Sequence, residues 1–117
     1  MKSAGVRSEL REDSIVFFLC GEIDHHSAKY LRERIDAEIY FFRPKKVVLE
    51  LSEVGFMDSA GLGLILGRYS AAKELGIALV IENPTIAVER ILKLCGIGGK
   101  IEIRKTELLT QKKGSDV

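Results

Sequence analysis

The sequence predicts an α/β fold, in which a single domain is built around a central mixed, mostly parallel β-sheet of four to five strands with α-helices. Short apolar runs alternate along the chain with longer stretches in which apolar residues recur at helical spacing. This alternation is typical of parallel strands joined by right-handed helical crossovers. The length of 117 residues, with no linker and no internal repeat, fits one domain of ordinary size.

The first part of the chain predicts a hairpin and then a helix. Residues 6–11 suit an edge strand, and residues 15–20 are continuously apolar, as in a strand covered on at least one face. The polar residues between these two runs suggest a hairpin turn. A helix is expected to run from there to about Phe41, with Ser27 or Asp24 as its cap, because its apolar residues fall on one stripe.

The middle of the chain predicts a strand, a loop, a helix and a further strand. Residues 47–51 form an apolar run that suits a buried strand, and residues 52–58 are expected to form a loop. The next helix is expected to begin near Ser59 and to end with Gly76 as its C-cap. Residues 77–81 then predict the following strand.

The last part of the chain predicts one more helix and strand before a polar tail. Asn83-Pro84 is a good helix start, since Asn caps well and Pro suits the first turn. The apolar stripe of this helix is expected to consist of Ala87, Val88, Ile91, Leu92 and Cys95. A last strand is expected at residues 100–103 and a terminal helix at 105–111. The domain should therefore span residues 5–111, with 112–117 as a tail.

The charge balance and the hydropathy pattern argue against two classes of partner. The chain has 18 Lys and Arg residues against 17 Asp and Glu residues, a net charge of +1. A dedicated nucleic-acid binder needs a strong positive patch, so we expect no direct nucleic-acid partner. The apolar runs are far shorter than the ~20 residues of a membrane span, and the N-terminus does not resemble a signal peptide. We therefore expect a cytoplasmic protein with no membrane partner.

The cysteines and histidines predict neither a disulfide framework nor a metal site. Cys20 lies in a strand-like run and Cys95 ends a helical run, so both are expected to be buried thiols in a reducing compartment. The chain has no pair of cysteines at zinc-ligand spacing, and His25 and His26 are adjacent rather than one helical turn apart. The sequence therefore predicts no bound metal and no cofactor.

Several aromatic and basic residues are expected to have ordinary structural roles. Aromatic side chains in and after the first predicted helix are expected to pack within the protein: Tyr30, Tyr40, Phe41 and Phe42. The pairs Lys45-Lys46 and Lys112-Lys113 are expected to be solvated charge.

The most informative segment is the seven residues from Met57 to Gly63. In this segment Ser59, flanked by Asp58 and Ala60, lies between a predicted strand and a predicted helix. Ser and Asp are good N-cap residues, because their oxygens accept from the free N–H groups of the first turn. A phosphate is also favoured there, since the N–H groups and the helix dipole attract negative charge. Ser59 could therefore be a cap, a nucleophile or a switch.

Two catalytic or nucleotide-binding interpretations fit the segment poorly. A hydrolase nucleophile elbow needs Gly two residues before the serine, where Met57 stands, and a triad needs a histidine that no spacing supplies. The glycines Gly61, Gly63 and Gly67 approach a dinucleotide fingerprint, but the third is one place late. The simplest alternative is that Asp58 or Ser59 only caps the helix. That alternative leaves three costly helix glycines unexplained, and a slim helix surface would suit close approach by another protein.

Phosphorylation offers a third interpretation of Ser59. A phosphoserine carries about −1.5 to −2 charges, which a helix N-terminus tolerates. A partner docked over the loop would lose a hydroxyl contact and meet an anion instead. This would be a binding switch that needs no large conformational change.

The residues from Phe56 to Tyr69 closely resemble the central motif of the STAS domains of anti-sigma factor antagonists. Residues 21–28 resemble the family's loop between the second strand and the first helix, and residues 47–51 and 92–97 also fit. The resemblance covers roughly residues 5–110, and it is strongest with the sporulation members of the family. These often carry a second Ser where this chain has Ala60, which leaves Ser59 as the acceptor in the motif.

The resemblance implies a specific function. The protein is expected to bind an anti-sigma factor that is also a serine kinase and so to release the sigma factor. Phosphorylation of Ser59 by that kinase would end binding, and a metal-dependent serine phosphatase would restore it. The protein itself is then a ligand and a substrate, with no catalytic residues of its own. The residues expected to contact the partner are Glu22, Asp24, His25, Asp58, Ala60, Gly61, Leu62, Gly63 and Arg68. The alternatives are a STAS module that binds a nucleotide or small molecule, or a general-stress regulator.

Overall fold

The structure is a computed structural model that describes residues 3–106 of the chain. Its strands are β1 (Gly5–Arg11), β2 (Ser14–Ile23), β3 (Lys46–Met57), β4 (Ala78–Glu82) and β5 (Glu102–Arg104). Its helices are α1 (Ala28–Phe42), α2 (Ser59–Glu74), α3 (Ile86–Leu94) and the short 3₁₀ helix η1 (Ile97–Gly99). The expected terminal helix at 105–111 lies outside the described residues, except for residues 105 and 106, which form neither helix nor strand.

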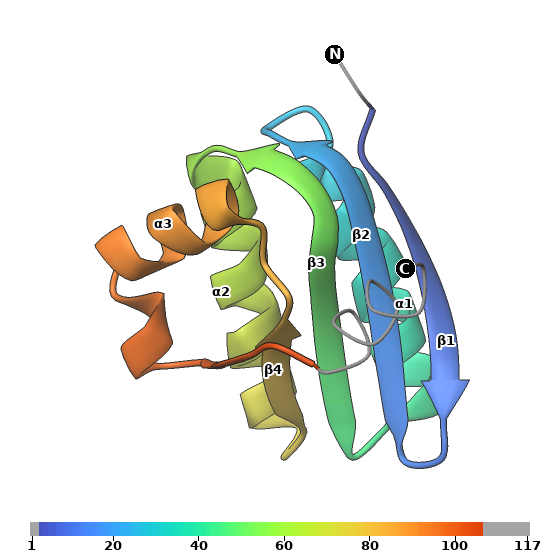
Figure 1. The fold of residues 1–117 in the computed structure, drawn as a ribbon. Helices are drawn as coiled ribbons and strands as arrows, with labels where there is room; N and C mark the ends of the chain where they lie inside the picture. The colour runs from blue at the N-terminus through green and yellow to red at the C-terminus, as the bar shows by residue number, and fades with distance from the viewer. Residues whose placement is uncertain (1–2, 107–117) are drawn as a thin grey trace, which may run out of the picture.

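The five strands form one mixed sheet in the order β1-β2-β3-β4-β5 (Figure 1). Strand β1 pairs antiparallel with β2 through a tight hairpin in which Leu10 lies opposite Ile15. The remaining pairs are parallel, and each parallel pair is joined by a crossover that contains a helix. The predicted mixed, mostly parallel α/β sheet is therefore confirmed.

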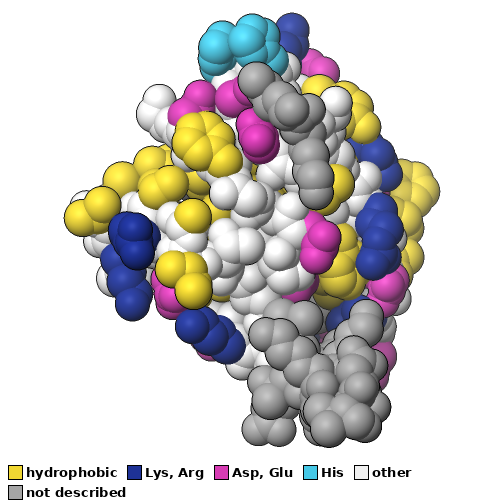
Figure 2. Space-filling model, turned by 45° about the horizontal axis from the view of Figure 1, so that its top comes forward, with side chains coloured by type: hydrophobic (Ala, Val, Ile, Leu, Met, Phe, Trp, Pro, Cys, Tyr) yellow, Lys and Arg dark blue, Asp and Glu magenta, His cyan; other side chains and the backbone are white. Residues whose placement is uncertain are grey.

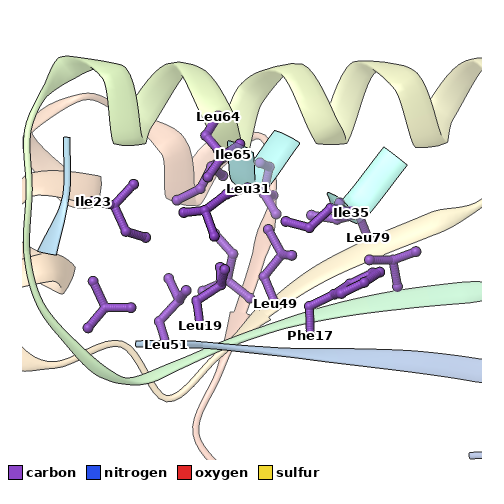
Figure 3. Packing of buried hydrophobic residues seen from close by; sticks show 14 of the residues in the cluster. Phe17, Leu19, Ile23, Leu31, Ile35, Leu49, Leu51, Leu64, Ile65 and Leu79 are labelled. Carbon is purple, nitrogen blue, oxygen red and sulfur yellow. The ribbon is translucent and has the colours of Figure 1, made fainter. Parts of the chain in front are cut away.

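The main core lies between one face of the sheet and the helices. Successive strand residues point to opposite faces, so alternate residues of β2, such as Phe17 and Leu19, enter this core. Helices α1 and α2 cover them with apolar stripes that include Leu31 and Ile65 (Figure 3). Helix α3 joins the same core through Val88. Because α1 follows β2, α2 follows β3 and these two strands are parallel, the N-termini of the two helices lie at the same end of the sheet.

Strand β3 is longer than the sequence predicts, and this is the most consequential difference in the fold. Residues 52–57 were expected to be loop, but they extend β3 and pair with the end of β2, with Ile23 opposite Met57. Two of these added residues, Val54 and Met57, are fully buried. The local composition alone does not favour a strand, but burial of these two side chains and the pairing with β2 stabilise one. As a result, only Asp58 separates the end of β3 from Ser59, the first residue of α2.

The start of α3 also differs from the prediction. The helix begins at Ile86 with Thr85 as its N-cap, whose side chain accepts from the Val88 N–H. Asn83 is not the cap, since it is buried with a positive φ and donates to the carboxylate of Glu50 at 2.8 Å. The Asn83 side chain, which was expected to cap the helix, therefore forms a hydrogen bond to the buried Glu50 carboxylate instead.

Three residues expected in the core are exposed. Cys20 is on the face of β2 opposite the main core, and Cys95 follows the last residue of α3, so neither is the buried thiol that was expected. Ala87 is exposed as well. The helix begins two residues later than predicted, and of its expected stripe Val88 and Leu92 are buried while Ile91 packs partly buried against the core.

Candidate functional site

Two loops meet where β2 and β3 end. Ile23 and Met57 are the last residues of these strands and lie opposite each other, and the Asp58 N–H donates to the Ile23 carbonyl at 3.2 Å. The turn of residues 24–27 that leads into α1 therefore lies beside the start of α2, at the upper end of the sheet in Figure 1. This juxtaposition follows the rule that carboxyl ends of neighbouring parallel strands share one edge.

Ser59 is the first residue of α2, and its side chain is exposed. The cap is Asp58, whose backbone is extended and whose Oδ1 accepts from the N–H groups of Ala60 at 2.8 Å and Gly61 at 3.4 Å. Within residues 3–106 the Ser59 hydroxyl makes no hydrogen bond, so capping leaves it free. Of the two capping residues that the sequence allowed, the structure selects Asp58.

Gly61 is buried under the loop, and a side chain would not fit there. A Cβ at this position would lie 2.6 Å from the Met57 Cβ and 3.3 Å from the Ile23 carbonyl oxygen. Gly63 and Gly67 differ, because a Cβ at either would meet nothing within 4 Å. Close packing therefore explains the first glycine only, while Gly63 leaves the helix surface slim beside Ser59.

An acidic rim, which we define as Glu22, Asp24 and Asp58, surrounds this end of the sheet. The side chains of Glu22, Asp24 and Asp58 are all partly accessible, and His25 and His26 are exposed with their ring centroids 3.9 Å apart. Figure 2 shows the histidines beside acidic side chains, with hydrophobic side chains on the adjoining surface. The rim thus presents carboxylates at the same end of the sheet as Ser59.

Asp24 organises the turn before α1. Its Oδ1 accepts from the N–H groups of His26 at 3.0 Å and Ser27 at 3.2 Å. Desolvation opposes ionisation, but the hydrogen bonds from Ser27 and His26 outweigh it and hold the pKa of Asp24 below its ordinary value. Ser27 occupies the N-cap position of α1, but its side chain makes no capping hydrogen bond. The Asp24 carboxylate instead accepts from the backbone N–H groups just before the helix.

Arg68 does not lie where the sequence analysis placed it. Its side chain was expected on the exposed surface of α2, but the residue is only 7% exposed. Its Nε lies 2.7 Å from Oδ1 of Asp36 on α1, an ion pair without the alignment of a hydrogen bond. Burial lowers the pKa of Arg68, and the Asp36 carboxylate opposes that shift. Arg68 therefore joins α2 to α1, and we no longer expect it to contact a partner directly.

A family model described as the STAS domain matches residues 6–108 of the chain. The chain belongs to the STAS domain family.

Named relatives of this STAS domain include anti-sigma factor antagonists. The chain is 33% identical over 92 residues to the "Anti-sigma F factor antagonist" of Paenibacillus polymyxa, an alignment that covers 79% of both chains. It is 31% identical over 96 residues to the "Anti-sigma-B factor antagonist" of Listeria monocytogenes, which covers 81% of this chain and 82% of that protein. Sequence identity thus does not separate the two kinds of antagonist.

The fold is similar to that of the anti-sigma factor antagonist SpoIIAA. The unphosphorylated form of SpoIIAA gives a TM-score of 0.76 at 24% identity, over 97% of this chain and 98% of SpoIIAA. The phosphorylated form of SpoIIAA, from Bacillus, gives 0.69 at 24% identity, over 92% of this chain and 98% of that one. At this identity the similarity shows a shared fold.

Sequence reasoning missed two apolar residues at the site end of the STAS domain. Phe56 is 48% exposed near the end of β3, and Ile86 is 77% exposed at the start of α3. The Thr85 hydroxyl donates to the Val54 carbonyl at 2.9 Å, which holds the start of α3 beside the end of β3. In a regular strand Phe56 would share the buried face of Val54, but the register shifts between these two residues, and a local sequence pattern does not reveal this irregularity.

The remaining site residues occupy the start of α2. Ala60 and Leu62 are partly exposed, and Gly63 is exposed. Among residues 3–106, no group of three or more His, Cys, Asp or Glu side chains is placed to hold a metal ion. No described helix has the length and apolar character needed to cross a membrane.

Proposed function

We propose that this STAS domain is an anti-sigma factor antagonist controlled by phosphorylation of Ser59. In the unphosphorylated form it binds an anti-sigma factor that is also a serine kinase, and this binding releases the sigma factor. The names of its relatives support the antagonist role. The protein acts in the cytoplasm as a ligand and a substrate rather than as an enzyme, and a metal-dependent serine phosphatase restores its active form.

The observation that carries the proposal is the free Ser59 hydroxyl at the start of α2. A serine that a kinase phosphorylates must have a hydroxyl that can enter the kinase active site, so it cannot be held by hydrogen bonds within its own domain. Ser59 meets this requirement because its side chain is exposed and Asp58 already supplies the helix cap. Transfer of a phosphoryl group to Ser59 therefore breaks no hydrogen bond among the described residues.

The electrostatics of the rim explain how phosphorylation would end binding. The acidic rim favours a partner surface that carries Lys or Arg, and such charges chiefly set association rate and partner choice. A phosphate at Ser59 would be tolerated by α2, which has no acidic residue in its first turn. It would also place about two negative charges and considerable bulk in a contact patch shaped for a hydroxyl.

Phosphate mapping tests the acceptor directly. The protein is incubated with its cognate kinase and ATP, and the modified peptide is mapped by mass. Ser59→Ala should abolish labelling, whereas Ser70→Ala should leave it unchanged, because Ser70 is an exposed serine further along the same helix. Label that persists in Ser59→Ala would move the acceptor to another residue and overturn this part of the proposal.

A matched pair of substitutions tests the switch itself. Ser59→Asp and Ser59→Asn have side chains of nearly equal size, so the difference between them reports charge. We expect Ser59→Asp to bind the kinase much more weakly than Ser59→Asn, measured by isothermal titration in the presence of ATP. Equal affinity of the two variants would show that charge at residue 59 does not control docking.

Acidic surroundings disfavour the alternative of a nucleotide-binding module. One hollow of about 370 Å³ at the site end includes Glu22 and Asp24 in its lining, and another of about 320 Å³ includes Glu22 and Glu53. Carboxylates repel the phosphates of a nucleotide. Titration of the isolated protein with nucleotides alone should show no saturable binding, and saturable binding would favour the alternative.

A further inference from the structure

The face of the sheet opposite the main core carries a second, separate apolar cluster. Val16, Val48 and Val80, one from each of β2, β3 and β4, are only 3%, 3% and 5% exposed. Phe18 of β2 packs against them, and we call these four residues the valine strip. Among the described residues, none from α1, α2 or α3 belongs to this cluster, because the buried apolar residues of these helices belong to the main core.

The sequence of the central strands predicts a covering layer on both faces. Parallel strands that are buried on both faces consist of continuous apolar runs, whereas strands buried on one face alternate. Residues 15–19, 47–49 and 79–81 are such continuous runs. In each run the odd-numbered residues belong to the main core, and the even-numbered residues belong to the valine strip. The helices supply the layer on the first face, so the second face needs a layer of its own.

The cover of the valine strip must belong to the same chain. Neighbouring strands pack beside a valine but leave it open from above, so an exposure of 5% or less needs a further layer. The exposures of the strip are those of a single chain, which excludes a second copy as the cover. Arg7 and Arg11 lie over the Phe18 ring, with their guanidinium carbons 4.1 Å and 5.7 Å from its centroid. They cover the β1 side of the strip, whereas Val80 lies two strands further along the sheet.

The exposed aromatic residues of α1 show the contrast. Tyr30, Tyr40, Phe41 and Phe42 were expected to pack within the protein, and this expectation is wrong, since they are 42% to 80% exposed. The buried stripe of α1 ends at Ile39, before the last three of them. Those side chains are left open, whereas the valine strip is closed.

The described part of the chain ends at the edge of the same face. The Thr106 N–H donates to the Asn83 Oδ1 at 2.9 Å. The Asn83 Nδ2 donates to the Thr106 hydroxyl oxygen at 3.1 Å and to the Glu50 carboxylate at 2.8 Å. Thr106 also lines one hollow of about 460 Å³ together with Val16 and Phe18. The residues after Thr106 therefore begin beside the valine strip.

The N-terminal end of the chain is too far away to be the cover. A Cβ at Gly21 would lie 2.2 Å from the Ser3 carbonyl oxygen, so Ser3 is beside Gly21 at the site end. Gly21 is five residues along β2 from Val16, which is about 16 Å. Two residues span at most about 7 Å, so residues 1 and 2 cannot reach the strip.

We propose that residues 107–117 lie across the valine strip and close the second face of the sheet, with Leu108 and Leu109 as the apolar contact. Glu50 is two residues along β3 from Val48, which is about 7 Å. Three residues of chain span up to about 10 Å, so Leu109 can reach the strip from Thr106. The proposal is independent of the phosphorylation switch, because neither Ser59 nor the acidic rim takes part.

The charges of the hollow favour this apolar occupant over a charged one. Its lining includes two arginines, Arg7 and Arg11, and three glutamates, Glu50, Glu53 and Glu82. Charges of both signs select neither a nucleic acid nor an anionic membrane, each of which needs a predominantly positive surface.

Nuclear Overhauser effects between methyl groups test the proposal on the full wild-type chain. With the Leu and Val methyl groups labelled, we expect effects from Leu108 or Leu109 to Val48 or Val80. A sample mixed from two differently labelled preparations should show no such effect between chains. Absence of these effects in the single-label sample would overturn the proposal, and so would effects between chains, because a second copy would then be the occupant.

A matched pair of double variants tests the contribution to stability. Leu108→Ser with Leu109→Ser should lower the folding equilibrium constant at least tenfold in urea, because buried leucines become exposed to water. The control is Ile86→Ser with Leu94→Ser, which removes two apolar residues that are already 77% and 81% exposed and should change the constant little. An equal effect of the two double variants would overturn the proposal.

Discussion

Gly61 offers a sharp test of how tightly the start of α2 is packed against the strand ends. We consider Gly61→Ala, which adds a single methyl group. In a helix interior Ala is favoured over Gly by about 1 kcal/mol, so propensity alone predicts a more stable protein. Packing predicts the opposite, because the new carbon would lie 2.6 Å from the Met57 Cβ. The two effects differ in sign, and their magnitudes decide the outcome.

The packing effect should exceed the gain in helix propensity. The Met57 Cβ is attached directly to the backbone of a residue that is 1% exposed, so it cannot rotate aside. Relief then requires α2 to move relative to β3, and overpacking of this kind costs about 1–3 kcal/mol. Taking the upper half of that range and subtracting the helix gain leaves a net loss of about 1–2 kcal/mol. For a domain of this size, the melting temperature should fall by about 3–10 °C.

The assay is urea and thermal unfolding followed by circular dichroism, with Gly67→Ala as the matched control. Gly67 is on the same helix, where an added Cβ would meet nothing within 4 Å, so propensity should act alone and raise stability by about 1 kcal/mol. The two variants should therefore shift the unfolding midpoint in opposite directions. If Gly61→Ala were as stable as the wild type or more stable, the close approach of α2 to Met57 could not be real.

Three further predictions concern the charged groups around the site. Asp58→Ala should lower the free energy of unfolding in urea by about 1 kcal/mol through loss of the cap, whereas Asp58→Asn, another good cap, should change it little. Asp36→Asn should lower the free energy of unfolding by about 1–3 kcal/mol, because it leaves the Arg68 guanidinium buried without its counter-charge. Adding Arg68→Met should recover most of that loss. Thermal melts of the single and double variants would measure both effects. The pKa of Asp24 is lowered in the folded protein, so its ionised carboxylate contributes to stability above the unfolded-chain pKa near 3.8, and this contribution is lost as the pH falls through the lower folded pKa. The difference in free energy of unfolding between wild type and Asp24→Asn should therefore shrink in acid. A difference that stays constant down to low pH would contradict the assignment.

The location of the site was accessible from the sequence because it depends on topology. Apolar runs separated by helical stretches predict parallel strands, and parallel strands bring their carboxyl ends to one edge. That reasoning predicts that Glu22 and Asp24 lie at the same end of the sheet as Ser59, and the hydrogen bond from the Asp58 N–H to the Ile23 carbonyl confirms that the two strand ends are adjacent. Local capping rules likewise identified Asp58 as one of two candidate caps.

Features that depend on non-local pairing were not accessible. Residues 52–57 have a mixed polar and apolar composition, and only the adjacent end of β2 makes them a strand. Arg68 is compatible with an exposed position until Asp36, which is 32 residues earlier, is known to face it. The aromatic residues after Ile39 match a helix stripe by composition, yet the core ends before them. For β3 and Arg68 a partner distant in sequence decided the environment, and for the aromatic residues the extent of the core decided it.

The geometry at Ser59 also indicates which kind of switch the protein can be. A phosphate at the start of a helix gains about 0.3–1 kcal/mol from the dipole, and repulsion by the neighbouring Asp58 carboxylate opposes this gain in an exposed, well-screened position. Both contributions are small compared with the 5–15 kcal/mol that stabilises a typical domain. Phosphorylation should therefore leave the sheet and the helices in place. The same anion in a desolvated interface would face a much larger cost, because charges that are unpaired and removed from water are strongly destabilising. The effect of the phosphate thus falls on the complex rather than on the fold, which is what a small domain needs if it is to be switched off and later recovered intact.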